Sequence, residues 1–122
     1  MDKETKCLEI DTKTRYLISQ GAPYPPENQT VVFSLSDKAQ SNWRSLFSTQ
    51  GWVECPYKVQ TNDNGIYVFA DSTEIANCCL YIFDLIHHYV ITGSELKLKV
   101  NEATTQEELD LVVDNRVVFN AQ

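Results

Sequence analysis

The chain has 122 residues, of which 43% are hydrophobic and 22% are charged, and its formal net charge is −7. This length suits one hydrophobic core, so we expect a single ordered domain over residues 1–122. No stretch approaches the roughly 18 uninterrupted apolar residues of a membrane helix, and an acidic surface repels nucleic acid and anionic lipid, so we expect neither a membrane nor a nucleic acid as partner.

The N-terminus and the cysteines indicate the compartment. Residues 1–6 mix acidic and basic side chains and no apolar stretch follows them, unlike in a secretory signal peptide. We therefore expect a cytoplasmic protein, in which cysteines are structural free thiols rather than disulfides, and we expect no cofactor. The four cysteines are Cys7, Cys55, Cys78 and Cys79.

The first expected element is a short helix from Thr12 to Gln20, capped by Asp11 and ended by Gly21. Residues 21–26 read Gly-Ala-Pro-Tyr-Pro-Pro and cannot lie inside a helix, so they predict an extended linker. The first twenty residues are then an appendage laid on the main body.

A strand over residues 30–36 is expected next, followed by a helix from Lys38 to Gln50. The apolar residues of this helix recur at the spacing of one helical face. Gly51 ends the helix, and Trp52 is placed to fold back as the hydrophobic contact of its C-cap. The apolar stripe comprises Ala39, Trp43, Leu46 and Phe47.

Residues 53–59 and 66–70 predict the two strands of a hairpin, joined by a turn over residues 61–65 in which Asn-Gly suits positive φ angles. Both faces of the second strand are apolar, which predicts an interior position in a sheet. Pro56 cannot donate to a strand ladder, so it indicates that the first strand lies at an edge.

The longest expected helix starts at Ser72 or Thr73 and ends near Gly93; it is apolar except for one narrow stripe, which predicts the main core helix. Residues 95–101 then alternate apolar and charged side chains and predict a half-buried strand. From residue 30 to 101 the order is β-α-β-β-α-β, which favours an α+β fold with a ferredoxin-like core.

A helix and a strand are expected to extend this core at its C-terminus. Thr105 and Glu108 form a capping box for the helix, and a turn at residues 114–115 leads into a strand over residues 116–120. A hairpin over residues 109–120 is the alternative.

Asp84, His87 and His88 form the one cluster of side chains that suits chemistry, because Asp84 and His88 share one helical face. They could form part of a metal site or a carboxylate–histidine pair. Adjacent histidines diverge on a helix, so we favour a structural role near the helix C-terminus and expect no metal site. A small ferredoxin-like metal- or ligand-binding domain is the alternative. The chain has no Gly-x-Ser-x-Gly elbow and no glycine-rich loop, so we expect no catalytic residues and no enzyme.

The acidic excess is confined to the second half of the chain. Residues 61–122 hold ten acids and three bases, a difference of −7, whereas residues 1–60 hold seven of each. Such a surface attracts a cationic partner, and an exposed tryptophan could anchor it. The predicted partner-binding residues are Asp63, Asp71, Glu74, Glu102, Glu107, Glu108, Asp110, Asp114 and Trp52.

Two short motifs carry a family resemblance. Trp43-Arg-Ser-Leu46 and Gly51-Trp-Val-Glu-Cys-Pro56 resemble the W-x-x-L and G-W-V-E-x-P stretch of the barstar family of intracellular ribonuclease inhibitors. That family has no hairpin like the one expected around residues 61–65, so no binding residue is transferred from it. The order of elements and the acidity are similar to those of the ribonuclease E inhibitor B family. Both resemblances imply a small acidic inhibitor of nucleases.

Charge and resemblance together predict a non-catalytic inhibitor that binds another protein. Nucleases hold phosphates in a cationic groove, which an acidic partner can occupy after electrostatically steered association. The leading hypothesis is a bacterial immunity protein that neutralises a basic nuclease toxin. A phage-encoded inhibitor of a host defence complex relies on the same physics and is the alternative.

Overall fold

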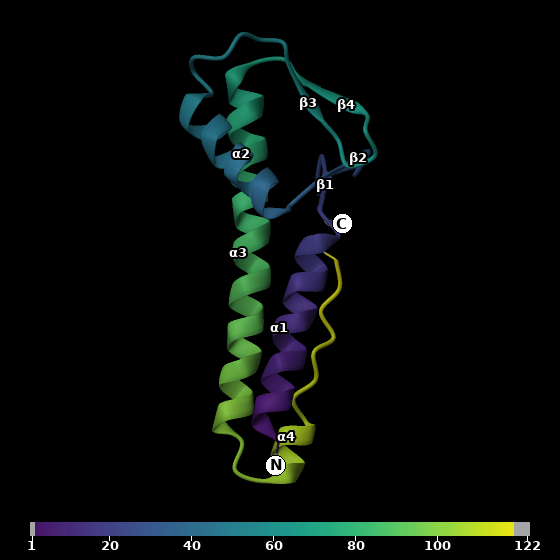
Figure 1. The fold of residues 1–122 in the computed structure, drawn as a ribbon, viewed down its shortest axis with the longest axis vertical. Coiled ribbons are helices and arrows are strands. Elements are labelled where there is room, and N and C mark those ends of the chain that lie inside the picture. Colours follow the sequence, from purple (N-terminus) through teal and green to yellow (C-terminus); the bar gives the residue numbers. More distant parts are fainter. Residues whose placement is uncertain (1, 119–122) are drawn as a thin grey trace.

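The structure is a computed structural model that describes residues 2–118. Figure 1 shows an elongated molecule in which two long helices lie side by side, with the strands at one end and the shortest helix at the other. Helices and two small antiparallel sheets together confirm the α+β class. In chain order the elements are α1 (Lys3–Ser19), β1 (Ala22–Tyr24), β2 (Val31–Phe33), α2 (Asp37–Thr49), β3 (Tyr57–Gln60), β4 (Ile66–Phe69), α3 (Ser72–Glu102) and α4 (Gln106–Asp110).

Helix α1 begins at Lys3, because Asp2 is a better cap than the predicted Asp11. The Asp2 carboxylate accepts a hydrogen bond from the backbone N–H of Thr5 at 2.9 Å, which satisfies one of the unpaired donors of the first turn. Asp11 instead lies inside the helix and forms an ion pair of 2.8 Å with Lys97 of α3. The predicted helix start at residue 12 is therefore wrong.

The first twenty residues are not an appendage, since α1 runs antiparallel to α3 along its length (Figure 1). Ile10 and Leu17, two turns apart on one face of α1, are both buried. At the far end the Lys3 ammonium donates a hydrogen bond of 2.8 Å to the carbonyl oxygen of Asn101. Packing of this face fixes the pair of helices that forms the long axis of the molecule.

The strand predicted over residues 95–101 is wrong, because these residues form the last turns of the 31-residue helix α3. The alternation that suggested a strand also fits a helix: Leu96 and Val100 are four residues apart and lie on one helical face, where Val100 is buried. Leu98, which a strand would have buried beside them, is 57% exposed. Without this strand the ferredoxin-like core is not shown, and the sheets are two separate hairpins.

The first hairpin, β1–β2, occupies part of the segment that was predicted as a linker. Pro23 lies opposite Val32 in the antiparallel register. Gly21 ends α1 as expected, with a φ of +85°. A Cβ atom at Gly21 would lie 2.7 Å from the carbonyl oxygen of Phe33, so the close approach of β2 also requires glycine.

The second hairpin, β3–β4, is confirmed, with Asn64 at a φ of 67° in its turn. Strand β4 is not an interior strand, because its sheet contains only β3 and β4. Its side chains split between two environments: Phe69 is buried, whereas Ile66 is 67% and Val68 47% exposed. A backbone hydrogen bond of 2.7 Å from Asn62 to the carbonyl oxygen of Val32 links the two hairpins.

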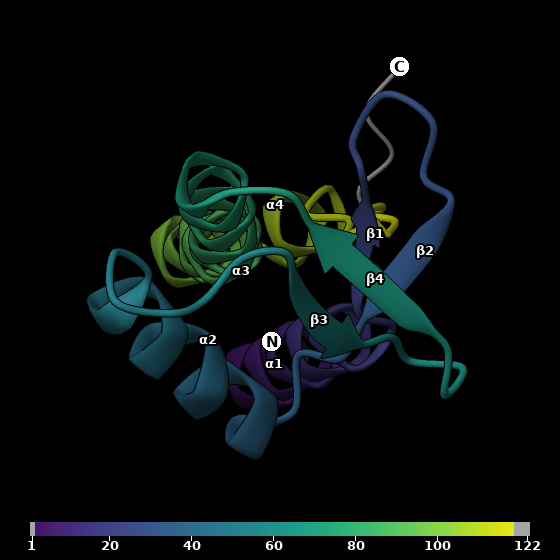
Figure 2. The ribbon, with the colours of Figure 1, turned by 90° about the horizontal axis from the view of Figure 1, so that it is seen from above.

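Helix α2 is confirmed within one residue at each end, and Ser36 caps it by accepting from the N–H of Ala39 at 3.1 Å. Trp43 and Leu46 are buried against α3 as the apolar stripe predicts. Trp52 does not form the expected C-cap contact, since its side chain is 89% exposed. Seen along the long axis, α2 and the hairpins lie on different sides of α3 (Figure 2).

Helix α3 carries most of the core. Its buried side chains line a larger cluster beneath the hairpins and a smaller one near α4. By length and mean hydropathy α3 could cross a membrane, but the core helix of a globular protein meets the same criteria. The smaller cluster comprises Ile10, Val100, Ala103, Leu109 and Val112.

After α3 the chain turns back into α4. Thr105 caps α4 as predicted, by accepting from the N–H of Glu108 at 3.1 Å. The segment that follows runs extended beside α1 (Figure 1). Residues 116–118 form no strand, and the described part of residues 109–120 forms no hairpin; residues 119 and 120 of these two predictions lie outside the described residues.

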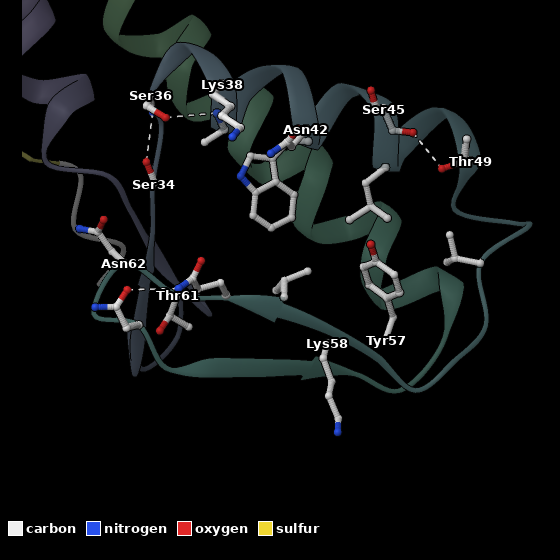
Figure 3. A pocket seen from close by; sticks show the side chains of 17 residues that line it. Ser34, Ser36, Lys38, Asn42, Ser45, Thr49, Tyr57, Lys58, Thr61 and Asn62 are labelled. Carbon is white, nitrogen blue, oxygen red and sulfur yellow. Dashed lines mark hydrogen bonds between the residues drawn. The ribbon is translucent and has the colours of Figure 1, made fainter.

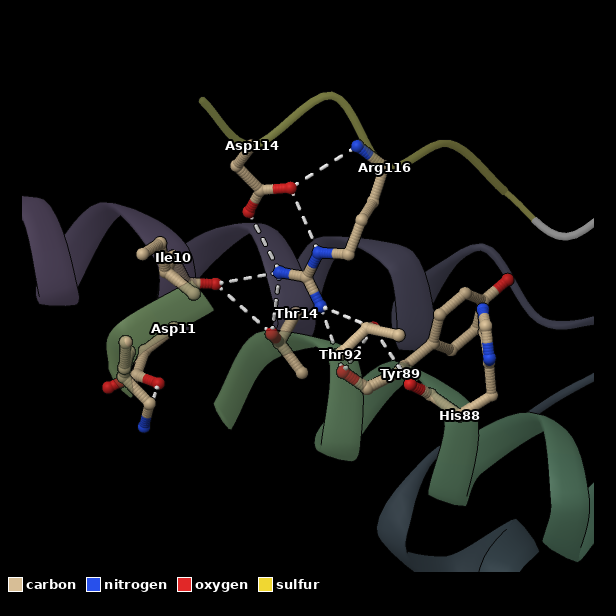
Figure 4. A network of polar contacts seen from close by, with 9 residues as sticks. Ile10, Asp11, Thr14, His88, Tyr89, Thr92, Asp114 and Arg116 are labelled. Atoms are coloured by element: carbon tan, nitrogen blue, oxygen red, sulfur yellow. Dashed lines mark hydrogen bonds and ion pairs between the residues drawn. The ribbon is translucent and has the colours of Figure 1, made fainter. Parts of the chain in front are cut away.

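Arg116 fastens this C-terminal segment to both long helices (Figure 4). One guanidinium nitrogen donates to the carbonyl oxygen of Tyr89 in α3 at 2.8 Å. The other donates to the hydroxyl of Thr14 at 2.9 Å and to the carbonyl oxygen of Ile10 at 3.2 Å, both in α1. Asp114 orients the guanidinium through contacts of 2.8 and 2.9 Å. One side chain therefore ties together three segments.

Candidate functional site

Three of the predicted partner-binding acids lie at the hairpin end of the molecule, and each carboxylate there shapes the local backbone. Asp63 accepts hydrogen bonds from the Thr61 hydroxyl and from the Gly65 N–H within the β3–β4 turn, and these hold its pKa below the usual value. Asp71 caps α3 by accepting from the Glu74 N–H at 2.9 Å.

Glu74 completes this cap, because its carboxylate reaches back to the N–H of Ala70 at 2.7 Å. Asp71 and Glu74 are both exposed, so solvent reaches these charges while they stabilise the helix start. The sequence identified these residues as binding candidates, and the structure shows that they also have a structural role.

A second group of acids gathers at the opposite end, around α4. Glu108 accepts from the N–H of Thr104 at 2.7 Å and from its hydroxyl, which lowers the Glu108 pKa. Asp110 accepts from the Gln106 amide at 2.8 Å. Glu102 and Glu107 are exposed, and their carboxylates form no hydrogen bond or ion pair among the described residues.

Leu111 lies directly after these acids and is 80% exposed. It is the C-cap of α4, and its own N–H is taken by the carbonyl oxygens of Glu107 and Glu108 at 3.2 Å each. A large apolar side chain held on a capped turn and bordered by carboxylates has the composition of a protein-binding surface. We call Glu102, Glu107, Asp110 and Leu111 the α4-end surface.

The structure brings charges of both signs to this end from the first half of the chain, because Lys3 lies there as well as Glu4. Figure 1 shows the N-terminus beside α4, and Glu4, from the balanced half of the chain, is exposed there in the first turn of α1. Only the antiparallel packing of α1 on α3 brings residues 4 and 102 to the same end. No local sequence pattern contains this information.

The predicted acids do not form one continuous face. Helix α3 separates the two groups, and its 31 residues span about 46 Å at 1.5 Å per residue. Asp114 belongs to neither group, because it is half-buried and its carboxylate is paired with Arg116 at 2.8 Å. The hydrogen bond from the Arg116 side chain lowers the Asp114 pKa.

Trp52 follows α2 at the hairpin end and is the most exposed of the large apolar side chains that the structure describes. Its backbone N–H donates to the carbonyl oxygen of Thr49 at 2.8 Å, which fixes the turn while the indole stays in solvent. The segment that follows α2 lies at the opposite end of the molecule from α4 (Figure 1). An exposed indole at this position remains available to a partner.

The Asp84, His87 and His88 cluster borders a shallow hollow of about 470 Å³ on α3. Among the described residues, no group of three histidine, cysteine or acidic side chains is arranged to hold a metal ion. The cysteines are free thiols, and burial raises the pKa of Cys79 to about 11 and that of Cys78 further. Such buried thiols are poor nucleophiles.

A larger groove of about 810 Å³ lies between α2 and β3 (Figure 3). Hydroxyl and amide side chains line it together with Trp43 and Tyr57, and its charged lining residues are Lys38 and Lys58. Its lining residues include no acid, although the chain as a whole is strongly acidic. No local sequence pattern indicates this groove, because its two walls come from α2 and β3, which are brought together only by packing on α3.

Comparison of the chain with protein-family models, with curated proteins and with solved structures finds no match.

Proposed function

We propose that the protein is a non-catalytic inhibitor that binds a cationic protein through the α4-end surface. The observation that carries the proposal is that Leu111 is exposed on the turn at the end of α4, the helix that contains Glu107 and Asp110. The carboxylates of Glu102 and Glu107 form no hydrogen bond or ion pair among the described residues, so their charges are available to a partner. An apolar anchor within an acidic border combines affinity with steering toward a basic surface.

The partner class that fits best is a basic nuclease. A nuclease must present cationic side chains to its phosphate substrate, and an acidic protein can cover that groove without being cleaved. The net charge of −7 also accelerates association with such a surface at low ionic strength. We therefore propose a bacterial immunity protein that neutralises a nuclease toxin in the cytoplasm.

A phage-encoded inhibitor of a host defence complex would use the same surface. Gene order separates the two possibilities, because an immunity gene lies beside the gene of its toxin. A neighbouring gene for a basic nuclease supports the first proposal, and a phage genome without such a gene supports the second.

The binding experiment compares two double charge reversals. Glu102→Lys with Glu107→Lys alters the α4-end surface without removing a cap. Glu27→Lys with Glu54→Lys makes the same change of charge at exposed sites elsewhere. Each protein is immobilised and exposed to a native lysate at low and high salt, and the retained proteins are identified and assayed for nuclease activity.

We expect the parent chain and the control to retain a basic nuclease at low salt and to inhibit it, and the α4-end variant to lose both properties. Retention that is indifferent to salt contradicts the proposal, as does equal retention by both variants.

A further inference from the structure

Strand β3 presents unpaired backbone groups along the edge that faces away from β4. The hydrogen bond of 2.9 Å from Thr61 to the carbonyl oxygen of Gly65 continues the β3–β4 register. In an antiparallel pair the bonded residues alternate, so the N–H and C=O groups of Val59 and Tyr57 also point to β4. Those of Lys58 and Gln60 therefore point outward.

The next outward group along this edge already has a strand partner. Asn62 has the same parity as Lys58 and Gln60, and its N–H donates to the carbonyl oxygen of Val32 in β2 at 2.7 Å. Beyond Phe33 the chain leaves β2 for α2, so this pairing stops after one bond. Among the described residues, no hydrogen bond joins the outward backbone groups of Lys58 or Gln60 to another segment of the chain.

The open edge borders the 810 Å³ groove, which residues 57–61 line consecutively. A run of consecutive strand residues at a groove indicates that the groove follows the backbone and not only one face of the hairpin. Tyr57 points toward α2 in Figure 3, and Val59, two residues on, shares its side of the strand. Trp43 and Leu46 form the opposite wall.

The charged side chains that line the groove are both basic. Lys58 points away from α2 on the outer side of the hairpin, and Lys38 lies at the start of α2 (Figure 3). A strand added beside β3 would alternate its side chains in the same way. One set would face the apolar wall beneath α2, and the other would lie beside Lys58, where cross-strand pairing favours an acid.

We propose that the edge of β3 binds an extended peptide segment of another protein, in which apolar and acidic residues alternate. The peptide adds a third strand to the β3–β4 sheet through the backbone groups of Lys58 and Gln60. This site lies at the hairpin end, far from the α4-end surface, so it is independent of the proposed inhibitor function.

The test uses a synthetic nine-residue peptide that alternates valine with glutamate, added at millimolar concentration to the ¹⁵N-labelled chain. Amide exchange with solvent is followed by NMR. At about ten times its Kd the peptide should slow exchange of the Lys58 and Gln60 amides about tenfold, because exchange then requires dissociation. The amides of Ile66 and Val68, on the outer edge of β4, are the internal control.

Two modified peptides separate strand addition from other modes of binding. Two peptides are made, each with N-methyl groups along a different edge. A methylated edge cannot pair with β3, so the peptide that is methylated on its pairing edge should bind at least tenfold more weakly than the other. A valine–lysine peptide should also bind more weakly to the parent chain. Lys58→Glu should reverse that preference.

A protein variant removes the donor itself. Gln60→Pro loses only an outward N–H, which an edge strand tolerates, and should abolish protection; Val68→Pro makes the matched change on the far edge and should not. No binding at millimolar peptide overturns the proposal. Binding without protection of Lys58 and Gln60, or equal binding of both N-methylated peptides, also overturns it and indicates a side-chain site.

Discussion

The guanidinium of Arg116 and the hydroxyl of Thr14 lie 2.9 Å apart, although 102 positions separate them in the chain. Thr14 in turn donates to the carbonyl oxygen of Ile10 at 3.1 Å, so the arginine joins an existing polar contact on α1. The same side chain reaches the Tyr89 carbonyl oxygen of α3. The Arg116 side chain therefore links the two long helices at one point.

Replacing Arg116 by alanine should lower the free energy of unfolding by about 2 kcal/mol, the scale of hydrogen bonds that involve a charged group. The change removes donors to α1 and α3 together and leaves Asp114 without its partner. Urea denaturation measures the effect, with Val117→Ala as control, because Val117 is 75% exposed. Equal stability of the two variants would show that the C-terminal segment is not fastened by this residue.

Gly93→Ala should destabilise the protein by about 1–3 kcal/mol, the usual range for overpacking. Alanine normally stabilises a helix interior relative to glycine by about 1 kcal/mol. Here a Cβ atom would lie 2.7 Å from the Thr14 hydroxyl oxygen and 3.1 Å from an Arg116 nitrogen, so the sign reverses.

The double variant Gly93→Ala, Thr14→Ala checks this explanation. Removing the hydroxyl should make the alanine at position 93 less costly, and thermal unfolding of all four proteins in the cycle measures the coupling. Strictly additive effects would contradict a clash between these two positions.

Stability should fall in acid partly through Asp114. The hydrogen bond from Arg116 lowers the Asp114 pKa in the folded protein, below the unfolded value of about 3.9. The ion pair therefore stabilises the fold above about pH 4, and this contribution is lost as the pH falls through the folded pKa.

Asp114→Asn isolates this contribution. The variant should be less stable than the parent at neutral pH, and it should lose less stability between about pH 5 and pH 2. Unfolding followed across this range by circular dichroism gives both slopes. Parallel curves for the two proteins would show that Asp114 does not contribute to the acid sensitivity.

Asp71 separates a structural role from a binding role. Asp71→Ala should lower the free energy of unfolding by about 1 kcal/mol, because the carboxylate caps α3. Asp71→Asn keeps a capping oxygen and removes the charge, so it should leave stability nearly unchanged. Chemical denaturation of both variants decides the matter; equal losses would indicate that the charge matters more than the hydrogen bond.

The sequence alone determined the elements whose signals are local. The apolar stripe through Trp43, with Gly51 after it, predicted helix α2 to within one residue at each end. The Asn-Gly turn set the β3–β4 hairpin, and Thr105 set the start of α4. Such signals depend on neighbours within a few residues, so no distant contact is needed to interpret them.

Residues 95–101 show where local reasoning fails. Leu96, Leu98 and Val100 satisfy a strand period of two, while Leu96 and Val100 also satisfy a helix period of four. The choice depends on what covers them, and α1 and α4 cover one helical face. The same packing explains why the first twenty residues contribute a core helix and are not the predicted appendage.

The acidity of the second half, and the residues that carry it, were available from the sequence. Only the tertiary structure decided that two groups of these acids lie at opposite ends of α3. It also decided that Asp114 forms an ion pair with Arg116 and that the Leu111 side chain is exposed beside carboxylates. The groove beside β3 likewise exists only in the tertiary structure. Composition fixes how much charge a chain carries, but the packing of helices far apart in sequence fixes which charges share a surface.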